Sequence, residues 1–294
     1  MTNSPVDPFY DFGGAGPLLH FAHANGYPPA AYTPLFDGLT PHYHVIAMRS
    51  RPLVPGSDPA SLRSWLPLVD DLIAFLDAQG AARSGAAGGW LGVGHSLGAV
   101  TTVLAALRRP ELFRAIVAIE PVFFNPLKLA AFDIFRGLGL ADRVHPLIAG
   151  ARRRRRVFAS ADEMFARYRQ AAVFSRMDDR SLRAYVDALA APRADGPGVA
   201  LAFTPEWEAQ IYATGPFNLW RQLVKLSVPM LVIRGADSDT FDLGAVRTLH
   251  RRLPRVTITN VPGTGHLVPM EKPAEVARLI LDFLALGDSP SRIE

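Results

Sequence analysis

The sequence predicts an α/β fold, a doubly wound and mostly parallel sheet with an inserted helical cap. Short unbroken apolar runs alternate with longer segments of helical periodicity, and one long stretch, 121–215, interrupts the alternation. Unbroken apolar runs are typical of strands that are buried on both faces of a parallel sheet. Strand–helix alternation places functional residues at the carboxyl ends of the strands. Six strands are expected, at 17–22, 45–48, 90–94, 115–119, 230–234 and 256–260.

Helical spacing supports the alternation. Residues 61–79 carry apolar side chains three and four positions apart, and residues 97–108 and 273–286 show the same pattern. The stretch 121–215 contains no convincing strand, and two helices are expected in it, at 163–174 and 178–189.

A stretch of this length between two strands is too long for a loop. We therefore predict a core of residues 1–120 and 216–294, with a helical cap insertion at 121–215.

Composition narrows the classes of protein. The 294 residues are 49% hydrophobic and 20% charged, which is typical of a globular protein rather than a disordered one. There is no cysteine, so disulfides, thiolate zinc sites and a cysteine nucleophile are excluded. No membrane span and no amino-terminal leader pattern is recognisable, so a cytoplasmic protein is expected, with no membrane partner.

The net charge of +4 is concentrated in the insertion, where the run 152–156 consists of five arginines. Without interleaved aromatic residues, such a run is weak evidence for nucleic acid. We interpret it as a solvated helix face with Asp162 and Glu163 as local partners, and expect no nucleic-acid partner. The oligomeric state is not predictable from the sequence.

A candidate nucleophile lies in residues 92–98, GVGHSLG, between an expected strand and an expected helix. This context favours a nucleophile elbow, in which Ser96 occupies a strained turn that lifts its hydroxyl above the sheet. Gly94 and Gly98 provide the room that so sharp a turn requires. The helix begins after Ser96, so the Leu97 N–H is expected to point at developing negative charge.

A serine hydroxyl needs a base that accepts its proton, and His266 is the candidate. It lies in the glycine-rich segment PGTGHL, after the last expected strand and before the last expected helix. The base in turn needs a carboxylate that orients it. Asp237 and Asp239 follow an expected strand, and Glu120 ends another. Asp239 is favoured, with Asp237 and Glu120 as alternatives.

Three motifs together, GVGHSLG, VIRGADSD and PGTGHLVPMEKP, resemble the α/β-hydrolase superfamily over nearly the full length. The chain order Ser96, Asp239, His266 agrees with that fold. The resemblance implies an α/β-hydrolase fold with a helical cap. It also implies an acid a few residues beyond a strand-ending glycine, which favours Asp239 or Asp237 over Glu120.

The resemblance further implies a second oxyanion donor in the loop HANGYPP, where relatives commonly have histidine followed directly by glycine. If Gly26 corresponds to that glycine, the donors are the N–H groups of Tyr27 and Leu97. Alternatively, His23 keeps its structural role in a longer loop and Asn25 faces the pocket, where its side chain could donate.

Aromatic residues are frequent in the insertion, and Phe124, Trp207 and Tyr212, with Asn25, are candidates for the substrate pocket. For most of these aromatics, a place in the core of the cap is the better interpretation. The expected activity is hydrolysis of an ester, thioester or lactone through an acyl-enzyme, on a small-molecule acyl substrate and without a cofactor or metal. A carbon–carbon bond hydrolase, a lyase, a perhydrolase or a small-molecule receptor remain alternatives.

Overall fold

The computed structural model describes residues 7–82, 88–138, 146–215 and 218–288. Its main sheet has seven strands in the order β1-β3-β2-β4-β5-β9-β10. β1 pairs antiparallel with β3, and every other pairing in this sheet is parallel. The strands are β1 (Phe9–Gly13), β2 (Leu18–Ala22), β3 (His44–Met48), β4 (Trp90–His95), β5 (Phe113–Ile119), β9 (Met230–Gly235) and β10 (Thr257–Val261).

The expected α/β architecture with a mostly parallel sheet is confirmed, and all six expected strands are present within two residues. The additional strand, β1, lies at the edge of the sheet and none of its residues is fully buried. Its sequence FYDFG therefore lacks the unbroken apolar character that marks the buried strands.

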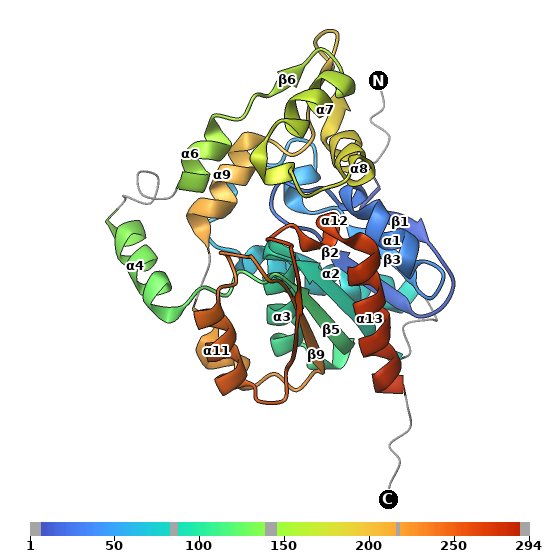
Figure 1. Cartoon of the computed structure of the whole chain (residues 1–294), viewed down its shortest axis with the longest axis vertical. Helices are drawn as coiled ribbons and strands as arrows, with labels where there is room; N and C mark the ends of the chain where they lie inside the picture. Colours follow the sequence, from blue (N-terminus) through green and yellow to red (C-terminus); the bar gives the residue numbers. More distant parts are fainter. Residues whose placement is uncertain (1–6, 83–87, 139–145, 216–217, 289–294) are drawn as a thin grey trace, which may run out of the picture.

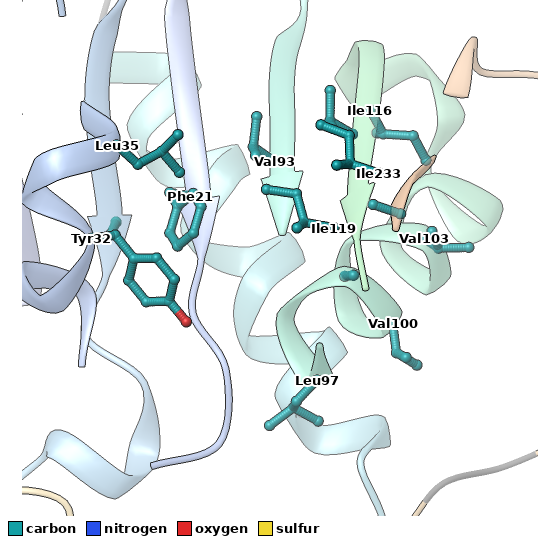
Figure 2. Close-up of a cluster of buried hydrophobic side chains, with 14 of the residues drawn as sticks. Phe21, Tyr32, Leu35, Val93, Leu97, Val100, Val103, Ile116, Ile119 and Ile233 are labelled. Atoms are coloured by element: carbon teal, nitrogen blue, oxygen red, sulfur yellow. The ribbon is translucent and has the colours of Figure 1, made fainter. Parts of the chain in front are cut away.

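Helices flank the sheet: α1 (Thr33–Leu39), α2 (Leu66–Ala82), α3 (Leu97–Arg108), α11 (Leu243–Arg252), α12 (Val268–Glu271) and α13 (Pro273–Asp288). Short 3-10 turns precede or join them: η1 (Pro29–Tyr32), η2 (Arg51–Leu53), η3 (Pro59–Ser61) and η5 (Pro110–Leu112). α3 packs on β4 and β5 and also on α2, whereas α1 packs on α13. In Figure 2, Tyr32 and Leu35 lie on one side of Val93 of β4, and Val100 and Val103 lie on the other. Apolar side chains thus cover both faces of the sheet, as burial of its strands requires.

The segment between β5 and β9 contains α4 (Pro126–Gly137), α6 (Pro146–Arg152), β6 (Val157–Phe158), α7 (Ala161–Arg169), η6 (Ala172–Phe174), α8 (Asp179–Leu189), β7 (Ala190–Pro192), β8 (Val199–Leu201), α9 (Pro205–Thr214) and α10 (Trp220–Leu223). The expectation of a purely helical segment is wrong, because β6, β8 and β7 form a small antiparallel sheet. Strands of two or three residues are too short to show an alternating pattern.

The domain boundaries at 120/121 and 215/216 stay a prediction, and residues 216–217 lie outside the described residues.

Most of this segment lies above the main sheet in Figure 1, where α6, α7, α8 and α9 form the upper part of the molecule. α9 is tied to the loop between β3 and α2, since Trp65 Nε1 donates to the Ile211 carbonyl at 2.9 Å and Gln210 Nε2 donates to the Leu62 carbonyl at 2.7 Å. The insertion therefore packs on a loop that follows the carboxyl end of a core strand. Among the described helices, none is long and apolar enough to cross a membrane.

The five arginines at 152–156 do not form a helix face, because α6 ends at Arg152. Arg155 pairs with Glu163 at 2.7 Å, as expected, but Asp162 pairs with Arg183 instead. The expected helix is therefore wrong, but four of the five arginines, all except Arg154, are exposed as expected. Three of the five line a cleft inside the insertion.

Candidate active site

The turn between β4 and α3 holds Ser96 in a strained conformation. β4 ends at His95 and α3 begins at Leu97, so Ser96 alone makes the turn, with φ 55° and ψ −115°. A positive φ is uncommon for a residue with a side chain and indicates a constraint imposed by its surroundings. A Cβ on Gly94 would come within 2.4 Å of the Gly98 carbonyl oxygen, so only glycine allows this close approach. The turn is the predicted elbow.

The structure brings Ser96 and His266 together from sequence positions far apart. His266 Nε2 lies 2.9 Å from Ser96 Oγ, and His266 Nδ1 lies 3.0 Å from Glu120 Oε2. Because an ionised carboxylate only accepts hydrogen bonds, the Nδ1 carries the hydrogen and Nε2 is left to accept from the serine hydroxyl. This is the tautomer that a general base for Ser96 needs.

Glu120 is fully buried directly after β5 and is held on three sides. Its Oε1 accepts from the Gly235 N–H at 2.7 Å, and its Oε2 accepts from the Ser238 hydroxyl at 2.5 Å as well as from His266. Its backbone has a positive φ of 46°. Hydrogen bonds to the charged form stabilise a buried carboxylate that would otherwise be costly. Glu120 is therefore fixed in place and oriented toward the histidine.

The structure places Glu120, and neither aspartate, against His266, which corrects the preference for Asp239. Asp239 is exposed, and its Oδ1 accepts from the Thr240 hydroxyl at 3.4 Å. Asp237 pairs with Arg176 at 2.9 Å. Of the residues in the loop after β9, it is Ser238 that contacts the carboxylate beside His266: its hydroxyl donates to Glu120.

Sheet order explains why the sequence did not decide among the acids. Ser96 follows β4 and His266 follows β10, while both β5 and β9 lie between those strands. An acid at the end of either intervening strand lies between the nucleophile and the base. Sequence spacing cannot choose between the two, but the longer glutamate side chain reaches the histidine from β5.

The first expected oxyanion donor, Leu97, is the first residue of α3, so its N–H has no carbonyl acceptor within the helix. The second, Tyr27, is not available, since its N–H donates to the Ala24 carbonyl at 3.2 Å across a turn in which Gly26 has φ 81°. The N–H of Asn25, inside that turn, has no hydrogen-bond partner within the described ranges. The main-chain N–H of Asn25, rather than that of Tyr27, is therefore the group of this loop that is left to donate to a ligand.

A buried network joins the three loops of the site through His95, the residue before the serine. His95 Nε2 lies 2.8 Å from the His266 carbonyl oxygen, so this nitrogen donates and Nδ1 accepts. Tyr32 donates to that Nδ1 at 2.8 Å and accepts from the Ala24 N–H at 3.2 Å. Burial holds the pKa of His95 well below its usual value, so the ring stays neutral. The network fixes the spacing between the loop after β2, the elbow and the histidine loop.

Two further carboxylates hold loops of the site. Glu271 Oε2 accepts from the Gly265 N–H at 2.7 Å, next to His266, and burial raises the pKa of Glu271. Asp237, through its pair with Arg176, links the loop after β9 to the insertion.

The aromatic pocket candidates are all buried or half-buried. Trp207 is 2% exposed, and its Nε1 donates to Ser57 Oγ at 3.1 Å, so it belongs to the core. Phe124 is half-buried against the same core. Tyr212 packs beside a separate small cluster of Ile148, Ala151 and Ala209, and lines a cleft.

The Asn25 side chain is buried, and its Nδ2 donates to the Glu208 carbonyl at 3.0 Å. This bond holds the side chain against α9 of the insertion. Among the described residues, no group of three or more His, Asp or Glu side chains is placed to hold a metal ion.

A parallel sheet with a strained serine between a strand and a helix is the architecture of α/β hydrolases. A family model described as "Alpha/beta hydrolase family" matches residues 21–279. The chain belongs to this family of hydrolases.

Individual relatives of the chain are also hydrolases. The chain is 27% identical over 273 residues to 2-(acetamidomethylene)succinate hydrolase of Mesorhizobium japonicum, covering 92% of this chain and 89% of that protein. It is 34% identical over 121 residues to a strigolactone esterase of Pisum sativum, covering 38% and 42%. A crystal structure of E-2-(acetamidomethylene)succinate hydrolase superposes with a TM-score of 0.76 at 22% identity, covering 94% of each chain. The thioesterase domain from the curacin biosynthetic pathway superposes with a TM-score of 0.68 at 18% identity, covering 93% and 94%. At these identities, the structural likeness supports the fold alone.

Proposed function

We propose that the protein is a serine hydrolase that cleaves a carboxylic ester or a related acyl bond through Ser96, His266 and Glu120. The observation that carries the proposal is the continuous hydrogen-bonded line from Glu120 through His266 to the strained Ser96. A nucleophile, a base within hydrogen-bond reach and a carboxylate that orients the base are the elements of acyl transfer.

In the proposed reaction, Ser96 Oγ attacks the acyl carbon while its proton passes to His266 Nε2. Glu120 stabilises the imidazolium that forms, because its carboxylate accepts from Nδ1 at 3.0 Å. The N–H groups of Leu97 and Asn25 donate to the developing oxyanion. His266 then gives its proton to the leaving group, and water hydrolyses the acyl-enzyme by the reverse sequence of proton transfers.

The relatives leave the acyl class open. One is named for hydrolysis of a compound with an acetamido group on a dicarboxylate, and another is an esterase. A serine nucleophile and two oxyanion donors serve esters, thioesters and activated amides alike. We propose esters and thioesters as the first substrates to examine, because their leaving groups need less assistance than an amine.

The test is a panel of p-nitrophenyl esters, thioesters and lactones with the wild type and the Ser96→Ala variant. The proposal expects turnover that Ser96→Ala reduces by several orders of magnitude while the melting temperature is retained. Equal rates in the two proteins would exclude Ser96 as the nucleophile. Tight binding of a small molecule without turnover of any panel member would favour a receptor.

A further inference from the structure

A cleft of about 840 Å³ lies inside the insertion, bounded by α6, α7, α8 and α9, and we call it the arginine cleft. It is lined by four arginines, Arg153, Arg154, Arg155 and Arg167, and by only two carboxylates, Glu163 and Glu208. Tyr27, Tyr168, Tyr185 and Tyr212 supply four phenol groups to the same walls. Its lining therefore carries a net positive charge together with neutral hydrogen-bonding groups.

Arg154 organises the inner wall of the cleft. Its Nη1 donates to Glu208 Oε2 at 2.5 Å, and its Nη2 donates at 3.0 Å to the hydroxyls of both Tyr168 and Tyr185. Each phenol oxygen accepts from the guanidinium, so each keeps its own O–H hydrogen for another acceptor. Within the described residues, neither hydrogen has an acceptor. Two O–H donors thus face a cleft beside the half-buried guanidinium of Arg154.

The remaining positive charge is on Arg153 and Arg167. Arg155 is neutralised by Glu163 at 2.7 Å, and Arg154 by Glu208, whereas Arg153 and Arg167 form no ion pair within the part of the chain that is described. Both are exposed. An oxyanion in the cleft would gain from two unpaired cations and from the phenol donors.

The arginine cleft adjoins the proposed oxyanion loop. Tyr27, two residues after Asn25, stacks on Tyr185 with ring centroids 4.8 Å apart. Glu208, which binds Arg154 through its side chain, accepts from Asn25 Nδ2 through its main chain. A group bound in the cleft is therefore in contact with the same helix and tyrosine that contact the loop after β2.

We propose that the arginine cleft binds an oxyanion group of the substrate, a carboxylate or a phosphate, so that the preferred substrates are anionic acyl compounds. The proposal rests on the proposed function of Ser96. It also gives the arginine run at 152–156 a role, because its middle three members face the cleft.

The test compares matched pairs of substrates that differ in one anionic group. p-Nitrophenyl hydrogen glutarate against p-nitrophenyl valerate tests a carboxylate on the acyl side, and butyryl-coenzyme A against butyryl-N-acetylcysteamine tests phosphate on the leaving group. The expected result is a higher kcat/KM for the anionic member of at least one pair. In the double variant Arg153→Gln/Arg167→Gln, that preference falls about tenfold, since each lost charge-assisted hydrogen bond weakens binding.

Arg156→Gln is the matched control, because Arg156 belongs to the same run but pairs with Glu206 outside the cleft lining. It should change the preference by less than about twofold, as expected for a surface ion pair. If the double variant has a lowered melting temperature, Tyr168→Phe is measured in its place, because this change removes one hydrogen-bond donor and keeps the ring. The preference of Tyr168→Phe for the anionic substrate should also fall.

Covalent labelling of Ser96 by a fluorophosphonate separates the two proposals. Labelling and neutral-ester turnover without an anionic preference in either pair would overturn the cleft proposal alone. An anionic preference that the double variant and Tyr168→Phe both leave unchanged would overturn it as well. Absence of labelling and of turnover would overturn the proposed function itself.

Discussion

Glu120→Gln should abolish most activity while leaving the fold intact, because the change replaces one carboxylate oxygen with a nitrogen of the same size. The Gln carbonyl can keep the bond to the Gly235 N–H, now 2.7 Å. The amide nitrogen then faces Ser238 and His266, where the carboxylate accepted. The Ser238 hydroxyl can rotate and accept, but His266 Nδ1 can accept only if its hydrogen moves to Nε2. In that tautomer Nε2 cannot take the proton of Ser96.

The magnitude follows from the loss of both the tautomer and the charge. The corresponding change in serine proteases lowers kcat about ten-thousand-fold, which corresponds to about 5 kcal/mol of transition-state stabilisation. We expect a loss of this order in kcat/KM for Glu120→Gln. The measurement is steady-state hydrolysis of a p-nitrophenyl ester, with thermal unfolding recorded on the same sample.

Asp239→Asn and Asp237→Asn are matched controls, since each also converts one carboxylate to an amide near the site. Asp239 is exposed, and Asp237 forms an ion pair with a half-exposed Arg176. Either change should therefore lower the free energy of unfolding by no more than about 1 kcal/mol, and kcat/KM should stay close to that of the wild type. A large loss in Asp239→Asn with near-normal activity in Glu120→Gln would refute the assignment of the acid.

Three further predictions concern the supports of the site. Tyr32→Phe leaves the Ala24 N–H and His95 Nδ1 without partners. It should lower the free energy of unfolding by about 1–3 kcal/mol per unpaired group and also lower kcat. A urea unfolding curve and a kcat equal to those of the wild type would contradict the role of this hydrogen-bond network. Trp207→Ala should cost about 3–5 kcal/mol in stability by thermal unfolding, because the ring is 2% exposed; a change in chain-length preference without destabilisation would instead make it a pocket residue. Burial lowers the pKa of His23 to about 4, so the unfolded chain binds more protons below about pH 6.5 and stability should fall as the pH drops from 6.5 toward 4. The urea midpoint of His23→Gln should therefore depend less on pH than that of the wild type, and equal slopes would contradict the assignment.

The buried strands and the elbow were predictable because their signals are local. Unbroken apolar runs marked β2, β4, β5 and β9, and the glycines around Ser96 marked the turn. Neither signal depends on how distant parts of the chain pack together.

The proposed acid and the proposed second oxyanion donor were not predictable, because each depends on contacts that the sequence alone does not show. Glu120 qualifies only because β5 lies beside β9 and the Gly235 N–H and Ser238 hydroxyl arrive from that strand's end. Tyr27 is disqualified only by a main-chain hydrogen bond to Ala24 that the sequence does not reveal.

The arginine run shows the same limit. Five consecutive basic residues indicate a surface, but only the position where α6 ends decides which of them line the cleft. The partners of Arg154, two tyrosines and Glu208, come from three other helices.

Covalent labelling shows whether Ser96 is a nucleophile that His266 activates. The protein is incubated with a fluorophosphonate, and peptide mass spectrometry locates the modified residue. We predict one modification, on Ser96, which is absent in Ser96→Ala and strongly slowed in His266→Ala, since the histidine lies 2.9 Å from the serine oxygen. Modification of another residue, or equal labelling rates in the wild type and His266→Ala, would contradict it.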